Sequence, residues 1–284
     1  MTSITLDSPN LPSGLYLVAT PIGNLKDITL RALEVLTSVD LIACEDTRVT
    51  KKLLTRFSIS TPTTSYNDYN ADHKLPDIMA ALEKGKAIAL VSDAGTPLIS
   101  DPGYKLVRAA REKNIMATSL PGASAVLTAI TLSGLPVDSF TFSGYLPPKE
   151  GALRTALEKT IQSDGTQIFF ESPKRLVKTL KMLADLNPEA RVCVARELTK
   201  LYEEVRIGRP EDVLNHYEAL PQVKGEIVLL VTPTVQEDQD WRTILKDRLK
   251  DVQVKQAVEE IASAYGIRKK DVYTQALEFK GVKK

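Results

Sequence analysis

The chain has 284 residues, of which 43% are apolar and 26% are charged, and its formal net charge is +1. This length allows one large domain or two ordinary ones, and the composition is that of a globular protein. No apolar run is long enough to cross a bilayer, and residues 1–13 lack the basic start and apolar core of a signal peptide. We therefore expect neither a membrane segment nor a secretion signal.

The first half of the chain alternates short apolar runs with segments of helical periodicity. The expected strands are 15–19, 41–44, 87–91, 115–120 and 139–145, and the expected helices are 28–39 with Asp27 as N-cap, 49–57, 75–82, 104–113 and 121–133. A polar loop is expected at 65–72. This alternation predicts a parallel sheet with helices on both faces.

A second α/β unit is expected after residues 146–151, where two prolines and a glycine indicate a linker. Its expected strands are 166–170, 191–195, 203–207 and 226–231, and its expected helices are 172–186, which Ser172-Pro173 would cap, together with 152–161 and 210–220. The alternating segment 203–207 is expected to run antiparallel, which makes the sheet mixed. From Trp241 the chain is expected to be helical, with 252–265 and 268–279 as a helix–turn–helix pair. The expected domains are therefore 1–145 (N-terminal α/β), 146–235 (second α/β) and 236–284 (basic, helical).

The polar stretch from Ser92 to Gly103 follows the most apolar strand of the first half. Open α/β sheets bind ligands at the carboxyl ends of their strands. Gly95 allows a ligand to approach the backbone closely, and Asp93 can accept hydrogen bonds from hydroxyl or ammonium groups. Asp101 followed by Pro102 predicts the N-cap and first turn of the next helix. An ordinary strand-to-helix turn would use the same residues.

The four cysteine and histidine residues indicate no metal site. Cys44 and Cys193 lie in apolar, strand-like runs, which predicts two buried free thiols in a reducing compartment. His73 and His216 share no ligand spacing with the cysteines, so we expect no bound metal.

The C-terminal region is more basic than the rest of the chain. Residues 242–284 contain eleven Lys or Arg and six Asp or Glu, a net charge of +5, so the preceding 241 residues carry −4. A basic region on a mildly acidic body is typical of a nucleic-acid contact. A solvated helical face would have the same composition.

Two common nucleotide-binding motifs are missing from the sequence. No Gly-x-Gly-x-x-Gly follows the first expected strand, and no Gly-Lys-Ser/Thr loop is present. These absences disfavour a dinucleotide-binding protein, the common Rossmann methyltransferase and a P-loop NTPase.

Several motifs resemble those of one enzyme superfamily. They are Thr20-Pro21-Ile22-Gly23-Asn24-Leu25, Glu45–Arg48, Ser92–Gly103, Pro121-Gly122, Phe169–Ser172, Ala195–Lys200 and Lys224–Glu226. In this order they resemble the tetrapyrrole-methylase-like (class III) S-adenosylmethionine-dependent methyltransferases. Within these, they are similar to the bacterial branch that methylates the ribose 2′-oxygen of a cytidine in the decoding centre of 16S rRNA. The resemblance covers residues 15–231 and, more weakly, the helical tail. The superfamily's usual Gly-Asp-Pro is here Ser92-Asp93-Ala94, as is typical of the rRNA branch.

The resemblance implies a two-domain tetrapyrrole-methylase-like fold with S-adenosyl-L-methionine bound in the cleft that the second domain closes. It also implies a homodimer in the bacterial cytoplasm, acting on 16S rRNA in the small ribosomal subunit, without a membrane or a metal. Carried over by position, the expected cofactor contacts are Ile22, Gly23, Asp93, Gly95, Thr96, Pro97, Ser124, Ala125, Phe170, Glu171, Ala195 and Arg196.

Catalysis of methyl transfer from a sulfonium depends mostly on alignment, and a ribose hydroxyl gains from a base or a cation. Glu45, Asp46 and Arg48 offer both at a strand end and are the candidate catalytic residues. A salt-bridged turn with a helix cap would use the same residues, and which group takes the proton stays open.

Candidate RNA contacts lie in the polar loop at 65–72. Tyr66, Asn67 and Asn70 could meet RNA by stacking or hydrogen bonding, and an exposed polar loop is the alternative.

Two other functions stay open at this point. One is a small-molecule methyltransferase of the same superfamily that acts on a tetrapyrrole, which the Glu45–Arg48 loop, the Ser92-Asp93-Ala94 variant and the basic tail disfavour. The other is a non-catalytic ribosome-assembly factor that retains the fold, which a failure to bind S-adenosylmethionine would favour.

Overall fold

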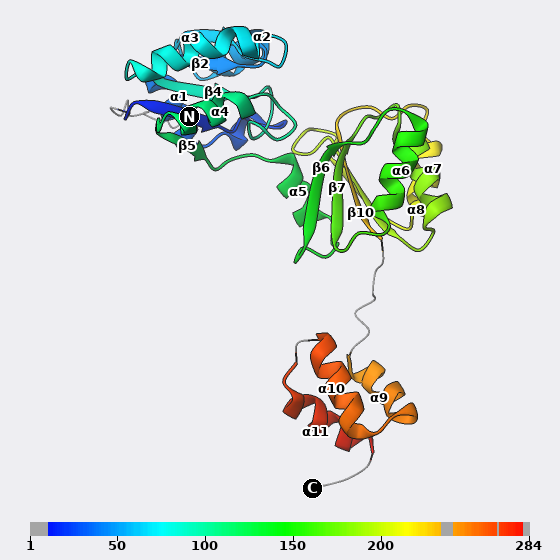
Figure 1. Cartoon of the computed structure of the whole chain (residues 1–284). Coiled ribbons are helices and arrows are strands. Elements are labelled where there is room, and N and C mark those ends of the chain that lie inside the picture. The colour runs from blue at the N-terminus through cyan, green and yellow to red at the C-terminus, as the bar shows by residue number, and fades with distance from the viewer. Residues whose placement is uncertain (1–10, 234–240, 266, 281–284) are drawn as a thin grey trace. The chain divides into compact units, whose positions relative to one another are not determined.

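The computed structural model describes residues 11–233, 241–265 and 267–280 (Figure 1). The chain forms two compact units, Met1–Pro233 and Thr234–Lys284, and each is described by itself.

The first sheet of the larger unit is entirely parallel, as predicted. Its strands are β1 (Gly14–Val18), β2 (Leu41–Cys44), β3 (Thr63–Ser65), β4 (Ala87–Val91) and β5 (Ala117–Leu120), in the order β3-β2-β4-β1-β5. All five residues of β4 are buried, which explains its unbroken apolar sequence. The short edge strand β3 was not predicted. Its last residue, Ser65, is the first residue of the expected polar loop at 65–72.

Helices cover both faces of this sheet, as predicted. They are α1 (Leu30–Ser38), α2 (Thr47–Arg56), α3 (Ala71–Glu83) and α4 (Tyr104–Glu112). Leu36 of α1 and Leu54 of α2 share one hydrophobic cluster, and Ile78 of α3 and Leu106 of α4 share another. The strand residues divide between the clusters because successive side chains of a strand point to opposite faces.

Two helix starts differ from the prediction. Thr29 is the N-cap of α1, because its hydroxyl oxygen accepts a hydrogen bond from the Ala32 amide at 3.1 Å, and Asp27 belongs to the preceding short 3₁₀ helix η1 (Leu25–Asp27). Helix α4 begins after Gly103, so the predicted cap at Asp101 is wrong. The backbone at Gly103 has a φ of +134°, and a Cβ there would lie 2.7 Å from Leu90 Cδ2, so only glycine fits this helix start.

The second sheet of the larger unit is mixed, as predicted. Its strands are β6 (Phe140–Tyr145), β7 (Thr166–Glu171), β8 (Arg191–Arg196), β9 (Glu204–Gly208) and β10 (Ile227–Thr232), in the order β6-β7-β10-β8-β9. Only the β6–β7 pair is parallel, and β9 runs antiparallel to β8. Strand β6 therefore belongs to this sheet, whereas the expected boundary after residue 145 grouped it with the first.

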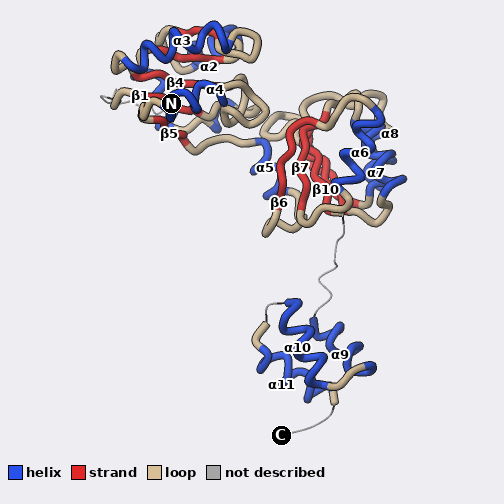
Figure 2. Tube along the Cα trace, in the orientation of Figure 1, coloured by secondary structure: helices blue, strands red, loops and turns tan. Residues whose placement is uncertain are grey.

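Helices also flank the second sheet, as Figure 2 shows. They are α5 (Ala125–Leu132), α6 (Glu150–Thr160), α7 (Leu176–Leu186) and α8 (Pro210–Glu218). The last three pack on one face of the sheet and α5 packs on the other, so each face has its own hydrophobic cluster. Neighbouring residues of β10 belong to different clusters: Leu229 packs with α6–α8, and Val228 packs with α5. The helix expected to start at Ser172-Pro173 begins later in the structure: α7 starts at Leu176, and Arg175 is its N-cap.

The smaller unit is helical, as predicted. It contains α9 (Trp241–Asp251), α10 (Val254–Tyr265) and α11 (Lys269–Phe279), which pack around Leu245, Ile261 and Val272. In the described parts of both units, we find no helix with the length and apolar character that a transmembrane segment requires.

Candidate functional site

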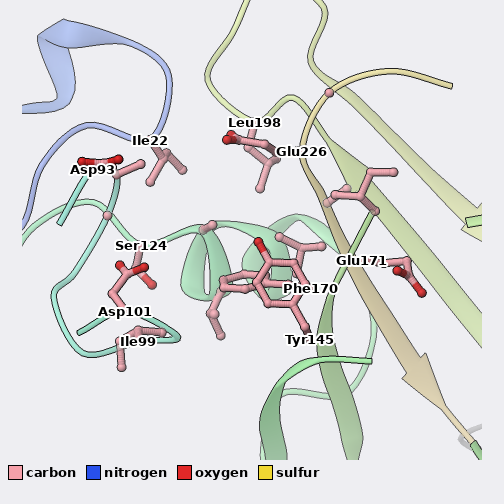
Figure 3. Close-up of a pocket in the computed structure, with 18 of the residues that line it drawn as sticks. Ile22, Asp93, Ile99, Asp101, Ser124, Tyr145, Phe170, Glu171, Leu198 and Glu226 are labelled. Atoms are coloured by element: carbon pink, nitrogen blue, oxygen red, sulfur yellow. The ribbon is translucent and has the colours of Figure 1, made fainter. Parts of the chain in front are cut away.

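A cavity of about 390 Å³ lies in the larger unit, where strand ends of both sheets meet (Figure 3). From the loops that follow strands of the first sheet it is lined by Ile22, Glu45, Asp93, Ala94, Gly95, Thr96, Ile99, Asp101 and Ser124, and from the start of α5 it is lined by Ala125 and Val126. From the second sheet it is lined by Tyr145, Phe170, Glu171, Ser172, Pro173, Ala195, Leu198, Gly225, Glu226, Ile227 and Val228. The loop residues from the first sheet lie in the segments after β1, β2, β4 and β5, at the edge where open α/β sheets bind ligands.

The loop after β4 is fixed by bonds to two neighbouring loops. Thr20 and Gly95 exchange both of their backbone hydrogen bonds at 2.9 Å, and the Thr96 hydroxyl donates to the Ala123 carbonyl at 3.0 Å. Gly95 has a φ of +80°, which suits glycine. The loop is therefore held in place by the chain itself before any ligand arrives.

The cavity wall is acidic. Its lining contains five carboxylates and, among the described residues, no Lys, Arg or His. Glu171 is neutralised by Arg175 and Glu226 pairs with Lys200, whereas the described residues offer no ion-pair partner to Glu45, Asp93 or Asp101. The cavity thus favours a ligand with positive charge.

Burial and mutual repulsion alter the acidity of these three groups. Burial raises the pKa of Glu45, and the neighbouring charges of Asp101 and Asp93 raise it further. Burial likewise raises the pKa of Asp93 and of Asp101. Asp93 is anchored, because its Oδ1 accepts a hydrogen bond from the Asp46 amide at 3.1 Å.

The candidate catalytic residues separate in the structure. Glu45 lines the cavity, but Asp46 and Arg48 do not. Asp46 is the N-cap of α2, and its carboxylate binds the Arg48 side chain at 2.6 Å. Hydrogen bonds from Arg48 lower the pKa of Asp46 to about 2. Both residues thus fit the alternative reading, a salt-bridged helix cap.

Most candidate cofactor residues line the cavity. They are Ile22, Asp93, Gly95, Thr96, Ser124, Ala125, Phe170, Glu171 and Ala195; Gly23, Pro97 and Arg196 do not line it. Arg196 instead bonds Glu204 at 3.0 Å.

Glu171 lines the cavity but its carboxylate is already used. The side chain is fully buried, and Oε1 accepts from the Ser172 amide at 2.6 Å and pairs with Arg175 at 2.6 Å. Oε2 accepts from the Thr179 hydroxyl at 2.7 Å. Glu171 therefore stabilises the end of β7, and three of the roughly four acceptor sites of its carboxylate are already used within the protein.

Gly23 has a different role from the expected one. A Cβ at this position would lie 2.5 Å from Lys200 Cγ and 2.8 Å from the Leu198 carbonyl oxygen. Beside it, the Asn24 amide donates to the Thr199 hydroxyl oxygen at 3.0 Å. Gly23 thus lets the loop after β1 pack directly on the loop after β8, which carries the lining residue Leu198.

The candidate RNA contacts also separate. Tyr66 is 1% exposed and packs in the hydrophobic core, so the expectation that its ring stacks on RNA is wrong for this conformation. Asn67 and Asn70 close a turn by exchanging backbone-to-side-chain hydrogen bonds at 2.9 and 3.2 Å. Neither lines the cavity, and the exposed ring of this loop is that of Tyr69.

Several lining residues were not predicted as site residues from the sequence, among them Asp101, Tyr145, Leu198 and Glu226. The sequence predicts Asp101 as a helix cap and Tyr145 as the last residue of a strand, and β6 does end at Tyr145. The position of Tyr145 beside Phe170 follows only from the pairing of β6 with β7, which the sequence does not show.

The two cysteines are buried free thiols, as predicted. Burial raises the pKa of Cys44 and raises that of Cys193 to about 12, so neither is a ready nucleophile. Among the described residues, no group of three or more His, Cys, Asp or Glu side chains is arranged to hold a metal ion.

Solved structures of low sequence identity share the fold of this chain. A uroporphyrin-III-C-methyltransferase from Thermus thermophilus is 19% identical, with a TM-score of 0.53, and the match covers 78% of this chain and 94% of that one. A cobalt precorrin-4 methyltransferase is 16% identical, with a TM-score of 0.54 over 77% of this chain and 94% of that one.

Sequence comparisons are more specific. Residues 14–214 match the family described as Tetrapyrrole (Corrin/Porphyrin) Methylases, and residues 235–280 match the RsmI C-terminal HTH domain. Proteins named "Ribosomal RNA small subunit methyltransferase I" are 49% identical in Erythrobacter litoralis, covering 95% of this chain and 96% of the relative, and 46% identical in Mesorhizobium japonicum, covering 95% and 93%. The relative in Vibrio cholerae is 44% identical over 96% of this chain and 98% of its own length.

The family models together match most of the chain, and the relatives align with it over nearly their whole length. The resemblance found in the motifs is therefore confirmed: the chain is a methyltransferase that belongs to the tetrapyrrole methylases and, within them, to the family of ribosomal RNA small subunit methyltransferase I.

Proposed function

We propose that the protein transfers a methyl group from S-adenosyl-L-methionine to the ribose 2′-oxygen of a cytidine in the decoding centre of 16S rRNA. The names of the relatives support an rRNA substrate in the small ribosomal subunit. The choice of ribose and of cytidine rests on the motif resemblance. The acidic lining of the cavity is the observation that supports S-adenosylmethionine as the proposed cofactor.

S-adenosylmethionine suits this cavity by charge. It carries a sulfonium and an ammonium against a single carboxylate, and the wall offers Glu45, Asp93 and Asp101, which have no ion-pair partner among the described residues. Phe170 adds an aromatic surface on the side of the second sheet. When bound, the cofactor supplies the methyl group. A cofactor with several phosphates would meet repulsion at the same wall.

Asp93 is the residue best placed to hold the positive end of the cofactor. It follows β4 directly, and the Asp46 amide fixes its carboxylate. Asp93→Ala is expected to weaken S-adenosylmethionine binding by about one to two decades, the loss of a charged hydrogen bond. Calorimetry measures this affinity. Asp46→Ala, which leaves the lining unchanged, is the control, and unchanged binding by a folded Asp93→Ala protein would refute the assignment.

Hydroxyl attack fits the residues better than attack by a base carbon. A cytosine ring carbon ordinarily needs a cysteine to activate the ring, and both cysteines are buried with raised pKa values. A hydroxyl needs alignment and a proton acceptor, and Glu45 and Asp101 are carboxylates of the cavity wall whose raised pKa values suit that task.

A homodimer in the cytoplasm is part of the proposal. Helix α5, the loop after it and the edge strand β6 expose Leu127, Leu132, Val137 and Phe140, large apolar side chains that a second copy would cover. Sedimentation of the purified protein tests this: a monomer at all concentrations would contradict it.

The product tests the reaction. Purified protein is incubated with labelled S-adenosylmethionine and small ribosomal subunits, and the RNA is digested to nucleosides and analysed by mass spectrometry. The expected result is a 2′-O-methyl nucleoside in the digest. In the undigested RNA, the phosphodiester next to this nucleotide should resist cleavage by alkali. Methyl recovered on a base, or transferred only to a precorrin-type substrate in a parallel reaction, would overturn the proposal.

A further inference from the structure

Tyr145 is an aromatic residue of the cavity wall that faces largely to solvent. It lines the cavity, yet 63% of its surface is exposed. A lining side chain with this exposure lies at the rim. Its ring meets that of Phe170 at 5.4 Å between centroids and 62° between planes, an edge-to-face contact (Figure 3). Such a contact holds the ring at its edge and leaves the rest of its surface available.

A local irregularity of β6 presents this ring. The pairing of β6 with β7 shifts between Phe142 and Tyr145, so that β6 holds one more residue than β7 over the same length. Gly144, within the bulge, has a φ of +70°, and a Cβ there would lie 3.2 Å from the Ser100 hydroxyl oxygen. Bulges are common beside active sites, where they redirect a side chain. The exposure of Tyr145 is therefore built into the backbone.

Tyr145 lies among the groups assigned to the chemistry. Burial raises the pKa of its phenol, and the charges of Glu226 and Asp101, and more weakly of Glu45, raise it further, while Arg175 lowers it. The ring thus lines the same cavity as these carboxylates.

We propose that Tyr145 is a substrate-positioning residue on whose ring the base of the target nucleotide stacks, so that the ribose hydroxyl is presented to the acidic wall. This inference rests on the proposed function. Bases of unpaired RNA stack on aromatic side chains, and such a contact needs no charge on the protein. Phe170, which is half-buried behind Tyr145, is left for the cofactor.

The test compares Tyr145→Leu and Tyr145→Phe in the full-length protein. Methyl transfer to small ribosomal subunits gives KM and kcat, and calorimetry gives the S-adenosylmethionine affinity. Loss of one stacked base predicts a KM for the subunit that rises about ten- to hundredfold in Tyr145→Leu, with cofactor affinity unchanged. Tyr145→Phe keeps the ring and should keep the wild-type KM.

Tyr104→Leu is the matched control, since Tyr104 is 68% exposed at the start of α4 and does not line the cavity. Its KM should stay at the wild-type value. Gly144→Ala keeps the ring but opposes the bulge, and it should raise KM in the same way as Tyr145→Leu. Circular dichroism and the retained cofactor affinity show that each variant is folded.

Several outcomes would overturn the inference. An unchanged KM in Tyr145→Leu, an equal loss in Tyr145→Phe, or a loss confined to cofactor affinity would each exclude base stacking on this ring. If the wild-type protein methylates ribose and the Leu variant keeps its KM, only this inference fails. If the wild-type protein transfers no methyl group to rRNA, the proposed function fails and this inference with it.

Discussion

The buried carboxylate of Glu171 depends on a single guanidinium. Arg175 pairs with it at 2.6 Å and also donates to the Leu146 carbonyl at 3.0 Å. Arg175→Met would leave this carboxylate buried with only its neutral donors. We expect the free energy of unfolding to fall by about 3–5 kcal/mol, the cost of breaking a buried pair from one side. Urea denaturation measures the change.

The neighbouring pair of Lys178 and Glu150 provides the control. Their side chains are 51% and 70% exposed, and they meet at 2.6 Å. Lys178→Met should lower the free energy of unfolding far less than Arg175→Met, because solvent screens exposed pairs. Equal losses in the two variants would show that burial of Glu171 does not set the cost.

Asp101 makes stability depend on pH. Burial raises the pKa of its carboxyl, so the folded protein keeps this proton at pH values where the unfolded chain has released it. Folding stability therefore falls as pH rises from the ordinary pKa of Asp through the raised one, and the cost is complete above it. Asp101→Asn removes this cost.

The expected result is a higher free energy of unfolding for Asp101→Asn at pH 7, with the advantage shrinking as the pH is lowered toward about 4, the ordinary pKa of Asp. Urea denaturation at the two pH values checks it. The same advantage at both values would show that the titration of Asp101 is not its source. Such a cost at a cavity-lining group is a usual exchange of stability for function.

At the scale of elements, the contact between the loops after β1 and β8 shapes the cavity. Gly23→Ala places a methyl group against Lys200 and the Leu198 carbonyl, and the backbone on that side has little freedom to move away. We expect the loops to separate, with a loss of about 1–3 kcal/mol in the free energy of unfolding and weaker binding of S-adenosylmethionine. Denaturation and calorimetry measure the two effects.

Gly151 allows the opposite substitution. It lies in the first turn of α6, and a Cβ there meets nothing within 4 Å. Gly151→Ala should leave cofactor binding unchanged and raise the free energy of unfolding by about 0.4–1 kcal/mol. Unchanged cofactor binding in Gly23→Ala as well would mean that this loop contact does not control the cavity.

Local sequence patterns predicted the helices and strands of this chain better than they predicted which strands pair with one another. The apolar run of β4 and the strand-end position of Asp93 were evident from spacing alone, because a buried parallel strand and its following turn leave a local signal. The pairing of β6 was not evident, since periodicity indicates a strand without naming its neighbour. That pairing also brings Tyr145 beside Phe170, a contact that the sequence could not show.

Some residues were predicted wrongly because the backbone conformation and the packing of loops decide where their side chains lie. Asp101-Pro102 has the composition of a helix start, but positive φ angles at Leu98 (+74°) and Ser100 (+65°) turn the chain before α4, and Asp101 faces the cavity instead. Such left-handed residues other than glycine are not expected from composition. Tyr66 and Tyr69 are alike in sequence terms, and only the packing of the loop decides which ring is buried.

At the scale of the molecule, the basic tail is a separate unit with its own hydrophobic core of residues 241–276. A chain ending at Pro233 retains every residue of the cavity lining, so it should keep its affinity for S-adenosylmethionine. We expect it to bind small ribosomal subunits more weakly and with a smaller salt dependence, because phosphate contacts by Lys and Arg would be lost. Filter binding across salt concentrations measures this.

The result that counts against an RNA-binding tail is a truncated protein with the subunit affinity and salt dependence of the full chain. The tail would then be a solvated appendage or a brace between copies. A further comparison keeps the tail and neutralises Lys269 and Lys270, which lie at the start of α11. It should give an intermediate salt dependence.

The position of β10 bears on how the protein is made. This strand lies between β7 and β8 and is the last strand of its sheet in chain order, so a nascent chain has two strand edges without a partner until residues 227–232 leave the ribosome. Ile227 and Val228 also form part of the cavity wall, so the cavity is incomplete before then. Unpaired edges promote association between chains. A ribosome stalled before this strand would therefore carry an aggregation-prone polypeptide, and only completion of nearly the whole catalytic unit turns it into a methyltransferase.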